Sequence, residues 1–422
     1  MSVPLDRLYN FLHSLVDHDI TIYRFWPHGS KKLEDCRLLN DLPYEFFSQS
    51  YLKSIPIICH DQEPLDIENL VTGTLRTPTP ITPTSVFRGI LFSIFNVYDK
   101  NLLCHSERNS EQLSKFESSG SIGVYYWCHA IIARDWFRYA EVDPSLTQRK
   151  VTRDFLIYNR AWTGTREYRL QFAELIVNHQ LDQFCRMGFN PNDGDTNYCD
   201  YTVKNPSFQI RRYDLEKYFS NNTTTSAASA DYVNVDYQET ELEVVLETLF
   251  DDSRWQLTEK ILRPIACGHP FILASTAGSL AYLRSYGFQT FENYIDESYD
   301  LESDPVKRLN MIISLLKQIT QMPSDKKLEL FNNMRKVAAF NRTRFFSDEF
   351  FNDVVNEYKH NIDAAVTKIK QCCTGSVIKY IFESVTNPLT VFNFEYFVGH
   401  GASQQDIDQL LDWVDQQNPL QS

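Results

Sequence analysis

A lysine and two glutamates stand near the end of one apolar run, in a spacing that suits phosphate and sugar binding. Glu247 ends the run that begins at Leu242, and Thr258, Glu259 and Lys260 open the helical pattern that follows. A lysine beside the free N–H groups of a helix N-terminus suits a phosphate, because both supply positive charge. A glutamate beside it suits the hydroxyls of a ribose or another sugar. The same residues also fit a helix cap followed by an ordinary surface lysine, so both interpretations stay open.

A second cationic group follows another apolar run. Residues 153–158 read as a buried strand, which ends at Asn159 and Arg160, and Arg166 stands just before the next helical pattern. Guanidinium groups close to a helix N-terminus form an anion site that suits a diphosphate. The alternative is a set of solvent-exposed arginines. We favour the phosphate interpretation, because Lys260 and these arginines would share one edge of a sheet.

The closest grouping of residues that could act as a general acid or base lies in the first half of the chain. The apolar run 55–59 leads directly to His60, Asp61 and Glu63. Partial burial raises the pKa of a carboxylate toward neutrality, which suits a general base that activates a hydroxyl group. We favour Asp61 or Glu63 as the base, with His60 as the competitor. The alternative is a helix N-terminus that Asp61 caps, with Glu63 in its first turn.

The elements that must position these residues read as alternating strands and helices. Strand 242–246 is followed by a helix that Thr258 caps and Gly268 ends, then by strand 270–273 and a helix that ends near Gly287. This order predicts a parallel α/β sheet. Such sheets bind ligands outside the carboxyl ends of their strands, where the candidate residues stand.

The first 145 residues repeat one pattern, an apolar run that ends at a histidine. Four of the ten histidines stand in this position: His28, His60, His105 and His129. A second Rossmann-like sheet would gather them at one edge. We therefore predict an α/β protein with two Rossmann-like domains, 1–145 and 150–345, and a helical C-terminal extension, 346–422. Helical periodicity is expected over 305–322, 324–343 and 347–370, and residues 288–291 read as a last strand.

Composition narrows the function classes. The 422 residues are 43% hydrophobic, which allows full hydrophobic cores. The net charge of −14 argues against a protein that binds nucleic acid through its overall electrostatic field. No run reaches the ~18 apolar residues that a membrane span needs. The N-terminus lacks the pattern of a signal peptide, and the nine cysteines form no CxxC pair, so a reduced cytoplasm is expected. Asp193-Gly194-Asp195 mimics a metal motif, but no apolar strand precedes it and we interpret it as a turn.

The segment TEKILRPIACGHPFIL, residues 258–273, resembles the donor-binding segment of fucosyltransferase-like glycosyltransferases of the two-Rossmann-domain (GT-B) type. In that family the Glu and Lys of the Thr-Glu-Lys motif contact the nucleotide-sugar. A strand that ends in Asn, with an arginine soon after, also touches the donor, which implies such a role for Asn159, Arg160 and Arg166. This chain has Tyr-Asn-Arg where Ser-Asn is common. The longer segment that continues from residue 258 to IDESYD, residues 295–300, resembles glycosyltransferase-like proteins of tailed phages. The HDQEPL segment, residues 60–65, resembles the same proteins.

The resemblance implies a glycosyltransferase that moves a sugar from a nucleotide-sugar to a hydroxyl acceptor. Lys260 and the arginines would neutralise the diphosphate, so no metal and no cofactor is expected. The phage resemblance implies 5-hydroxymethylated bases of phage DNA as the acceptor and the host cytoplasm as the location. A saccharide or protein acceptor, or a non-catalytic α/β binding protein of a phage, remains the alternative. No membrane partner is expected, and the oligomeric state is left open.

Overall fold

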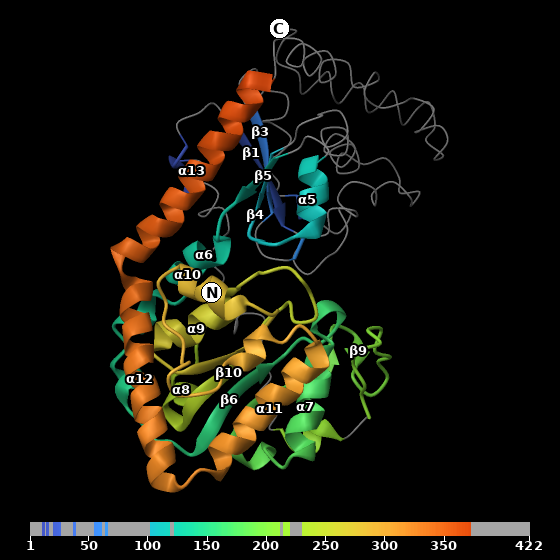
Figure 1. Ribbon diagram of the computed structural model, residues 1–422, viewed down its shortest axis with the longest axis vertical. Helices are drawn as coiled ribbons and strands as arrows, with labels where there is room; N and C mark the ends of the chain where they lie inside the picture. Colours follow the sequence, from blue (N-terminus) through green and yellow to red (C-terminus); the bar gives the residue numbers. More distant parts are fainter. Residues whose placement is uncertain are drawn as a thin grey trace. The chain divides into compact units, whose positions relative to one another are not determined.

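The computed structural model describes residues 11–12, 14–16, 20–26, 37–38, 55–60, 64–65, 102–118, 122–211, 214–219 and 230–372. These residues fall into two compact units, each with its own parallel sheet (Figure 1). Residues 129–355 form the C-terminal unit, and the described residues up to Cys128 form the N-terminal unit together with those from Asn356 onward. None of the described helices is long and apolar enough to cross a membrane. The parallel sheets and the helices between their strands confirm the α/β class predicted from the sequence.

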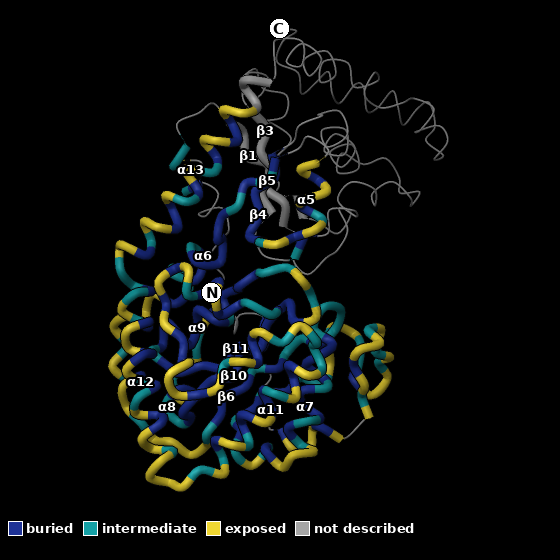
Figure 2. Tube along the Cα trace, in the orientation of Figure 1, coloured by how far each residue is buried: buried dark blue, intermediate teal, exposed yellow. Residues whose placement is uncertain are grey.

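The sheet of the C-terminal unit is entirely parallel. Its strands are β6 (Arg153–Asn159), β7 (Cys185–Phe189), β10 (Thr240–Leu246) and β11 (Phe271–Ala274), in the order β11-β10-β6-β7. All seven residues of β10 are buried (Figure 2), as expected for a central strand that helices cover on both faces. Figure 1 shows α7 (Tyr168–Asn178) and α11 (Pro305–Gln321) on one face, and α9 (Glu259–Cys267) and α12 (Ser324–Phe346) on the other.

Helix α9 begins and ends where its sequence predicts. The Thr258 hydroxyl accepts a hydrogen bond from the backbone N–H of Lys260, so Thr258 is the N-cap. Gly268 ends the helix in the left-handed region with φ of 66°, a conformation that glycine adopts at little cost. The apolar positions predicted for one face, including Ile261 and Ile265, are fully buried. Capping residues and periodicity thus fix this helix locally.

The helical C-terminal region is confirmed in its described part. Asp304 caps α11 by accepting hydrogen bonds from Val306 N (2.9 Å) and Lys307 N (3.0 Å). After α11 and α12 the chain continues as α13 (Asp348–Cys372). The strand predicted at 288–291 is wrong, because the structure has no strand there. The backbone of Gln289 instead exchanges two hydrogen bonds with the Asn341 side chain, 2.8 and 2.9 Å long.

The division between the units differs from the boundary predicted between residues 145 and 150. Helix α6 (Cys128–Trp136) lies before that boundary, yet from His129 onward it belongs to the C-terminal unit. The Arg134 guanidinium explains the difference, because it donates to the carbonyls of Phe345 and Ser347, 2.8 and 2.7 Å away. The shorter elements of the same unit are η3 (Arg138–Glu141), η4 (Pro144–Thr147), η5 (Gly164–Arg166), η6 (Asp182–Phe184), β8 (Asn192–Asp193), β9 (Thr196–Asn197), η7 (Leu215–Lys217), α8 (Asn234–Glu239), α10 (Ser279–Ser285) and η9 (Ser298–Leu301).

The N-terminal unit contains a five-stranded sheet in the order β2-β1-β3-β4-β5. Its elements are β1 (Ile20–Trp26), β2 (Arg37–Leu38), β3 (Ile55–His60), β4 (Leu102–His105), α5 (Glu111–Ser118) and β5 (Ile122–Tyr125). All pairings are parallel except that of β2 with β1. The predicted second parallel sheet is therefore present, and His60 and His105 end two neighbouring strands of it.

Candidate functional site

The C-terminal sheet reverses its winding between β6 and β10, because the strands that follow these two are added on opposite sides of the pair. From β6 the chain passes through α7 to β7 on one side, and from β10 it passes through α9 to β11 on the other. The carboxyl ends of β6 and β10, at Asn159 and Leu246, are therefore neighbours from which two helices diverge on opposite faces of the sheet. Open α/β sheets bind their ligands at such a point. The predicted donor-binding residues follow these two strands.

Arg169 ties the two strand ends together. Its guanidinium donates to the carbonyls of Leu246 (2.6 Å), Glu247 (3.0 Å) and Ala161 (2.6 Å), and the residue is only 3% exposed. Asn159 is fully buried, and its side-chain nitrogen donates to the Arg169 carbonyl at 2.9 Å. The amide nitrogen of Asn159 thus serves the scaffold. Asn159 Oδ1 has no hydrogen-bond partner in the described part of the chain.

Arg160 and Arg166 lie in the loop between β6 and α7. Arg160 follows the last residue of β6, Arg166 ends η5, and both are partly exposed. Their exposure and position suit the anion role predicted for them, which stays a prediction. The convergence of these arginines with Lys260 on one pyrophosphate stays a prediction too.

Asp193, although distant in sequence, makes hydrogen bonds to the same loop. It accepts hydrogen bonds from Trp162 N (2.9 Å), Thr163 N (2.7 Å) and the Thr163 hydroxyl (2.7 Å). Burial alone would raise its pKa, but these bonds and the nearby Arg166 charge lower it. Gly194, with φ of 60°, turns the chain between β8 and β9. The prediction of a turn at 193–195 is confirmed, and Asp193 holds the backbone that leads to Arg166.

Glu247 sets the start of α9 from inside the protein. The carboxylate is fully buried and accepts from Thr258 N (3.0 Å), from the Thr258 hydroxyl (2.6 Å) and from Thr248 N (3.3 Å). Burial raises its pKa above the usual value, against the opposing effects of the Lys260 charge and the Thr258 hydrogen bond. With these partners and no exposed surface, Glu247 positions the α9 N-terminus, and the sugar or ribose contact expected from the sequence stays a prediction.

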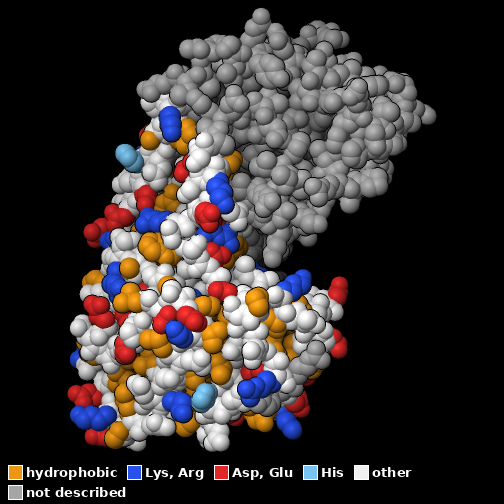
Figure 3. Space-filling view, turned by 45° about the vertical axis from the view of Figure 1, so that its right-hand side comes forward, with side chains coloured by type: hydrophobic (Ala, Val, Ile, Leu, Met, Phe, Trp, Pro, Cys, Tyr) orange, Lys and Arg blue, Asp and Glu red, His pale blue; other side chains and the backbone are white. Residues whose placement is uncertain are grey.

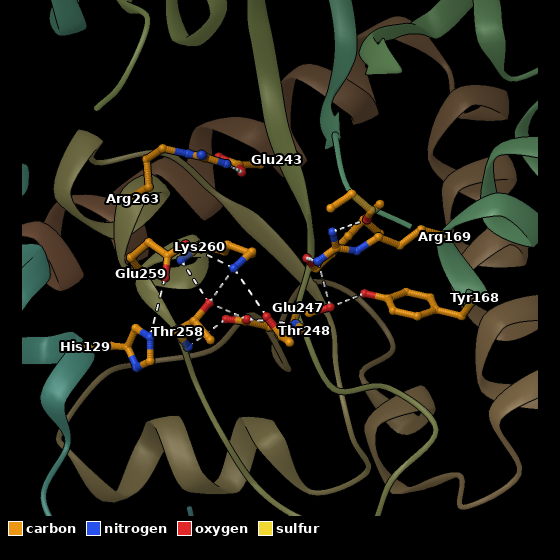
Figure 4. Close-up of polar contacts among 12 residues, drawn as sticks. His129, Tyr168, Arg169, Glu243, Glu247, Thr248, Thr258, Glu259, Lys260 and Arg263 are labelled. Atoms are coloured by element: carbon orange, nitrogen blue, oxygen red, sulfur yellow. Dashed lines mark hydrogen bonds and ion pairs between the residues drawn. The ribbon is translucent and has the colours of Figure 1, made fainter. Parts of the chain in front are cut away.

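Lys260 stands in the first turn of α9, surrounded by oxygen atoms (Figure 4). Its ammonium lies 3.0 Å from Glu259 Oε1, 3.2 Å from the Thr258 hydroxyl and 3.4 Å from the Thr248 hydroxyl. The side chain is 23% exposed, so the charge is held in place and still reaches solvent. A helix N-terminus adds its own positive potential at this point. Together they form a fixed cation beside the end of β10.

Glu259 joins Lys260 to a residue that sequence reasoning did not include in this site, His129. Glu259 Oε2 lies 3.6 Å from His129 Nε2, and both side chains are almost completely buried. Burial alone would raise the Glu259 pKa, but the charges of Lys260 and His129 lower it to about 2. Glu259 is therefore a carboxylate at neutral pH. The only sequence signal for His129 is its place after an apolar run.

Three predicted residues belong to the other unit. His60 ends β3, and its side chain is not among those described. Asp61 and Glu63 lie outside the described residues, as does the part of the predicted C-terminal extension after residue 372. The general base proposed from the sequence therefore stays a prediction.

Among the described side chains, no group of three or more His, Cys, Asp and Glu residues is arranged to hold a metal ion. Comparison with known proteins adds no further identification: no family model matches the chain, and neither the characterised proteins nor the solved structures contain a significant match.

Proposed function

We propose that this chain is a glycosyltransferase whose C-terminal unit binds the nucleotide-sugar donor. Lys260 carries the proposal, because its ammonium is fixed at a helix N-terminus beside the point where the sheet reverses its winding. A cation at a helix N-terminus in that place suits the phosphates of a nucleotide. The resemblance of residues 258–273 to a donor-binding segment agrees with this placement.

In the proposed reaction the positive groups stabilise the leaving nucleoside diphosphate. Lys260 would stabilise the negative charge that develops on the diphosphate as the bond between the sugar and the diphosphate breaks. Glu259 holds the ammonium through its 3.0 Å contact, and Glu247 keeps the first turn of α9 in place through Thr258. Such preorganisation lets the cation act without moving during the reaction. Arg160 and Arg166 are proposed to bind the same diphosphate.

The acceptor half of the proposal rests on the sequence. Asp61 or Glu63, with His60 as the competitor, would remove the proton of the acceptor hydroxyl. The acceptor is proposed to be a 5-hydroxymethylated base of phage DNA, with a saccharide or protein hydroxyl as the alternative. On the face seen in Figure 3, the described Lys and Arg side chains are interspersed with Asp and Glu. Local contacts, rather than the overall field of a chain with net charge −14, would therefore have to bind DNA.

Transfer and binding are tested separately. The full-length chain is incubated with 5-hydroxymethylated DNA and a panel of nucleotide-sugars, and the nucleosides are analysed by mass spectrometry for a hexose adduct. Free nucleoside diphosphates are titrated in parallel by calorimetry. We expect Lys260→Ala to weaken diphosphate binding by roughly tenfold to a hundredfold, the value of a lost charge-assisted hydrogen bond.

Lys326→Ala is the matched control. Lys326 also pairs with a glutamate, Glu329, at 3.1 Å, but its side chain is 65% exposed and it lies on α12. The Lys326→Ala variant should bind the diphosphate and transfer the sugar like the wild type. Diphosphate binding without transfer to DNA, saccharide or protein acceptors would favour the non-catalytic binding protein. Equal diphosphate affinity of Lys260→Ala and Lys326→Ala would contradict the donor site itself.

A further inference from the structure

The turn that follows β11 contains a buried hydroxyl group that the fold does not use. Thr276 is only 2% exposed, and its Oγ1 has no hydrogen-bond partner among the residues that the structure describes. A buried polar group without a partner costs free energy, so each one in a folded protein needs an explanation. Valine has nearly the same shape as threonine and would avoid this cost.

Other contacts already hold this turn in place. The Asp300 carbonyl accepts the backbone N–H of Gly278 at 2.7 Å. From the loop between β10 and α9, the Trp255 indole donates to the Ala277 carbonyl at 2.9 Å. Two segments that are distant from each other in the sequence therefore fix the turn through its backbone. The hydroxyl of Thr276 adds nothing to these contacts.

The register of the sheet places Thr276 beside the proposed donor site. Leu246 of β10 pairs with Ala274 of β11, and Thr248 and Thr276 each come two residues after this pair. The Thr248 hydroxyl lies 3.4 Å from the Lys260 ammonium (Figure 4). Thr276 thus follows the strand next to the one that leads to the fixed cation. Both lie at the carboxyl edge of the sheet, where α/β proteins bind ligands.

Trp255 lies against the same turn. A Cβ added at Gly278 would be 3.0 to 3.3 Å from three atoms of the indole, so the ring is in direct contact with the backbone there. Trp255, Ala277 and Gly278 are all partly exposed, although Thr276 beside them is buried. The turn therefore reaches the surface next to a single aromatic side chain.

A hydroxyl in this position suits a phosphate oxygen. A threonine hydroxyl can donate one hydrogen bond, and such a bond is stronger when the acceptor is an anion. The N-terminus of α9 and Lys260 favour an anion at this edge. The nearby carboxylates are already bonded, Glu247 to Thr258 and Glu259 to Lys260.

We propose that Thr276 is a further donor-binding residue, whose hydroxyl bonds to a phosphate oxygen of the nucleoside diphosphate after the Trp255 indole has moved off the turn. This inference rests on the proposed donor site at Lys260 and extends it from β10 to β11. The diphosphate then supplies the partner that the buried hydroxyl lacks within the described chain.

The test separates a ligand contact from a structural one. The full-length chain is titrated by calorimetry with inorganic pyrophosphate and with uridine, guanosine and thymidine diphosphates, and its stability without ligand is measured by urea unfolding. Thr276→Val should weaken the binding of pyrophosphate and of the bound diphosphate about tenfold. Its urea midpoint should equal or exceed that of the wild type, because an unpaired hydroxyl has been removed. Thr276→Ser keeps the hydroxyl and should restore most of the affinity.

Thr240→Val is the matched control. Thr240 is also fully buried, but it begins β10 at the opposite edge of the sheet, and its hydroxyl donates to the Asp236 carbonyl at 2.6 Å. This variant should lower the urea midpoint and leave the affinity for pyrophosphate unchanged. Pyrophosphate should also change the tryptophan fluorescence of the wild type, and Trp255→Phe should remove that change.

Several results would overturn the inference. Thr276→Val could bind pyrophosphate as tightly as the wild type, or lower the urea midpoint as much as Thr240→Val does. It could weaken the nucleoside diphosphates but not pyrophosphate, which would place the hydroxyl on the nucleoside. A fluorescence change that persists in Trp255→Phe would contradict the movement of the indole. No binding by the wild type overturns this inference and the donor site together, whereas weaker binding by Lys260→Ala alone overturns only the role of Thr276.

Discussion

The pH dependence of stability offers a direct test of the arrangement around Glu259. Burial alone would raise the pKa of this carboxyl group, but the charges of Lys260 and His129 lower it from 4.5 to about 2. One pKa unit corresponds to about 1.4 kcal/mol, so the ionised form should stabilise the folded protein by about 3 kcal/mol. Because the folded pKa is below the unfolded one, this stabilisation is complete above the unfolded pKa and is lost as the pH falls toward the folded value. By pH ~3 about 2 kcal/mol of it should be gone.

The assay compares the wild type with Glu259→Gln in urea unfolding at pH ~6 and pH ~3, followed by far-UV circular dichroism. Between these conditions the wild type should lose about 2 kcal/mol more than the variant. Glu111→Gln is the control, since Lys115 lowers the pKa of Glu111 as well but that side chain is exposed to solvent. Equal losses in the wild type and Glu259→Gln would refute the ion pairs that define the proposed donor site.

Three further predictions test the scaffold and the chemistry. Glu247→Ala leaves the buried N–H and hydroxyl of the α9 N-cap without their acceptor, which should cost about 2–4 kcal/mol in urea unfolding. Gly268→Ala should cost about 1–2 kcal/mol in the same assay, because φ is 66° and the new Cβ would lie 3.1 Å from Arg342 Cδ. Asp61→Asn or Glu63→Gln should lower kcat for transfer with less effect on donor affinity, measured by steady-state kinetics and calorimetry.

The chain supplies controls for these variants. Gly194 also has a positive φ, of 60°, but an added Cβ would meet nothing within 4 Å, so Gly194→Ala reports the backbone cost alone. If Gly268→Ala costs no more than Gly194→Ala, the contact with Arg342 is unimportant. Glu329→Ala removes an exposed carboxylate and should change stability by less than about 0.5 kcal/mol, against which Glu247→Ala is judged. If both Asp61→Asn and Glu63→Gln turn over like the wild type, the assignment of the base is wrong.

Local sequence signals predict the elements of the C-terminal unit well. Thr258 and Gly268 bound α9 as predicted, because an N-cap hydroxyl and a left-handed glycine act on the backbone of their own helix. The strands that become β6 and β10 were also recognisable, since a strand covered on both faces reads as an apolar run. Where a distant side chain decides, the prediction fails. Residues 288–291 read as a strand, yet the backbone of Gln289 in this segment bonds to the Asn341 side chain of α12.

The amino-acid pattern is enough to predict that an acid–lysine pair opens a helix after a strand. The role of each charge in that place follows from the packing of distant segments around it. Glu247 turned out to be an internal cap acceptor, Arg169 a tie between strand ends, and His129 a partner of Glu259. The physical reason is that a buried charge must find its counter-charge or hydrogen bonds in whatever segment packs against it. That segment is set by the tertiary packing, which brings together residues as distant in sequence as Arg169 and Leu246, or His129 and Glu259.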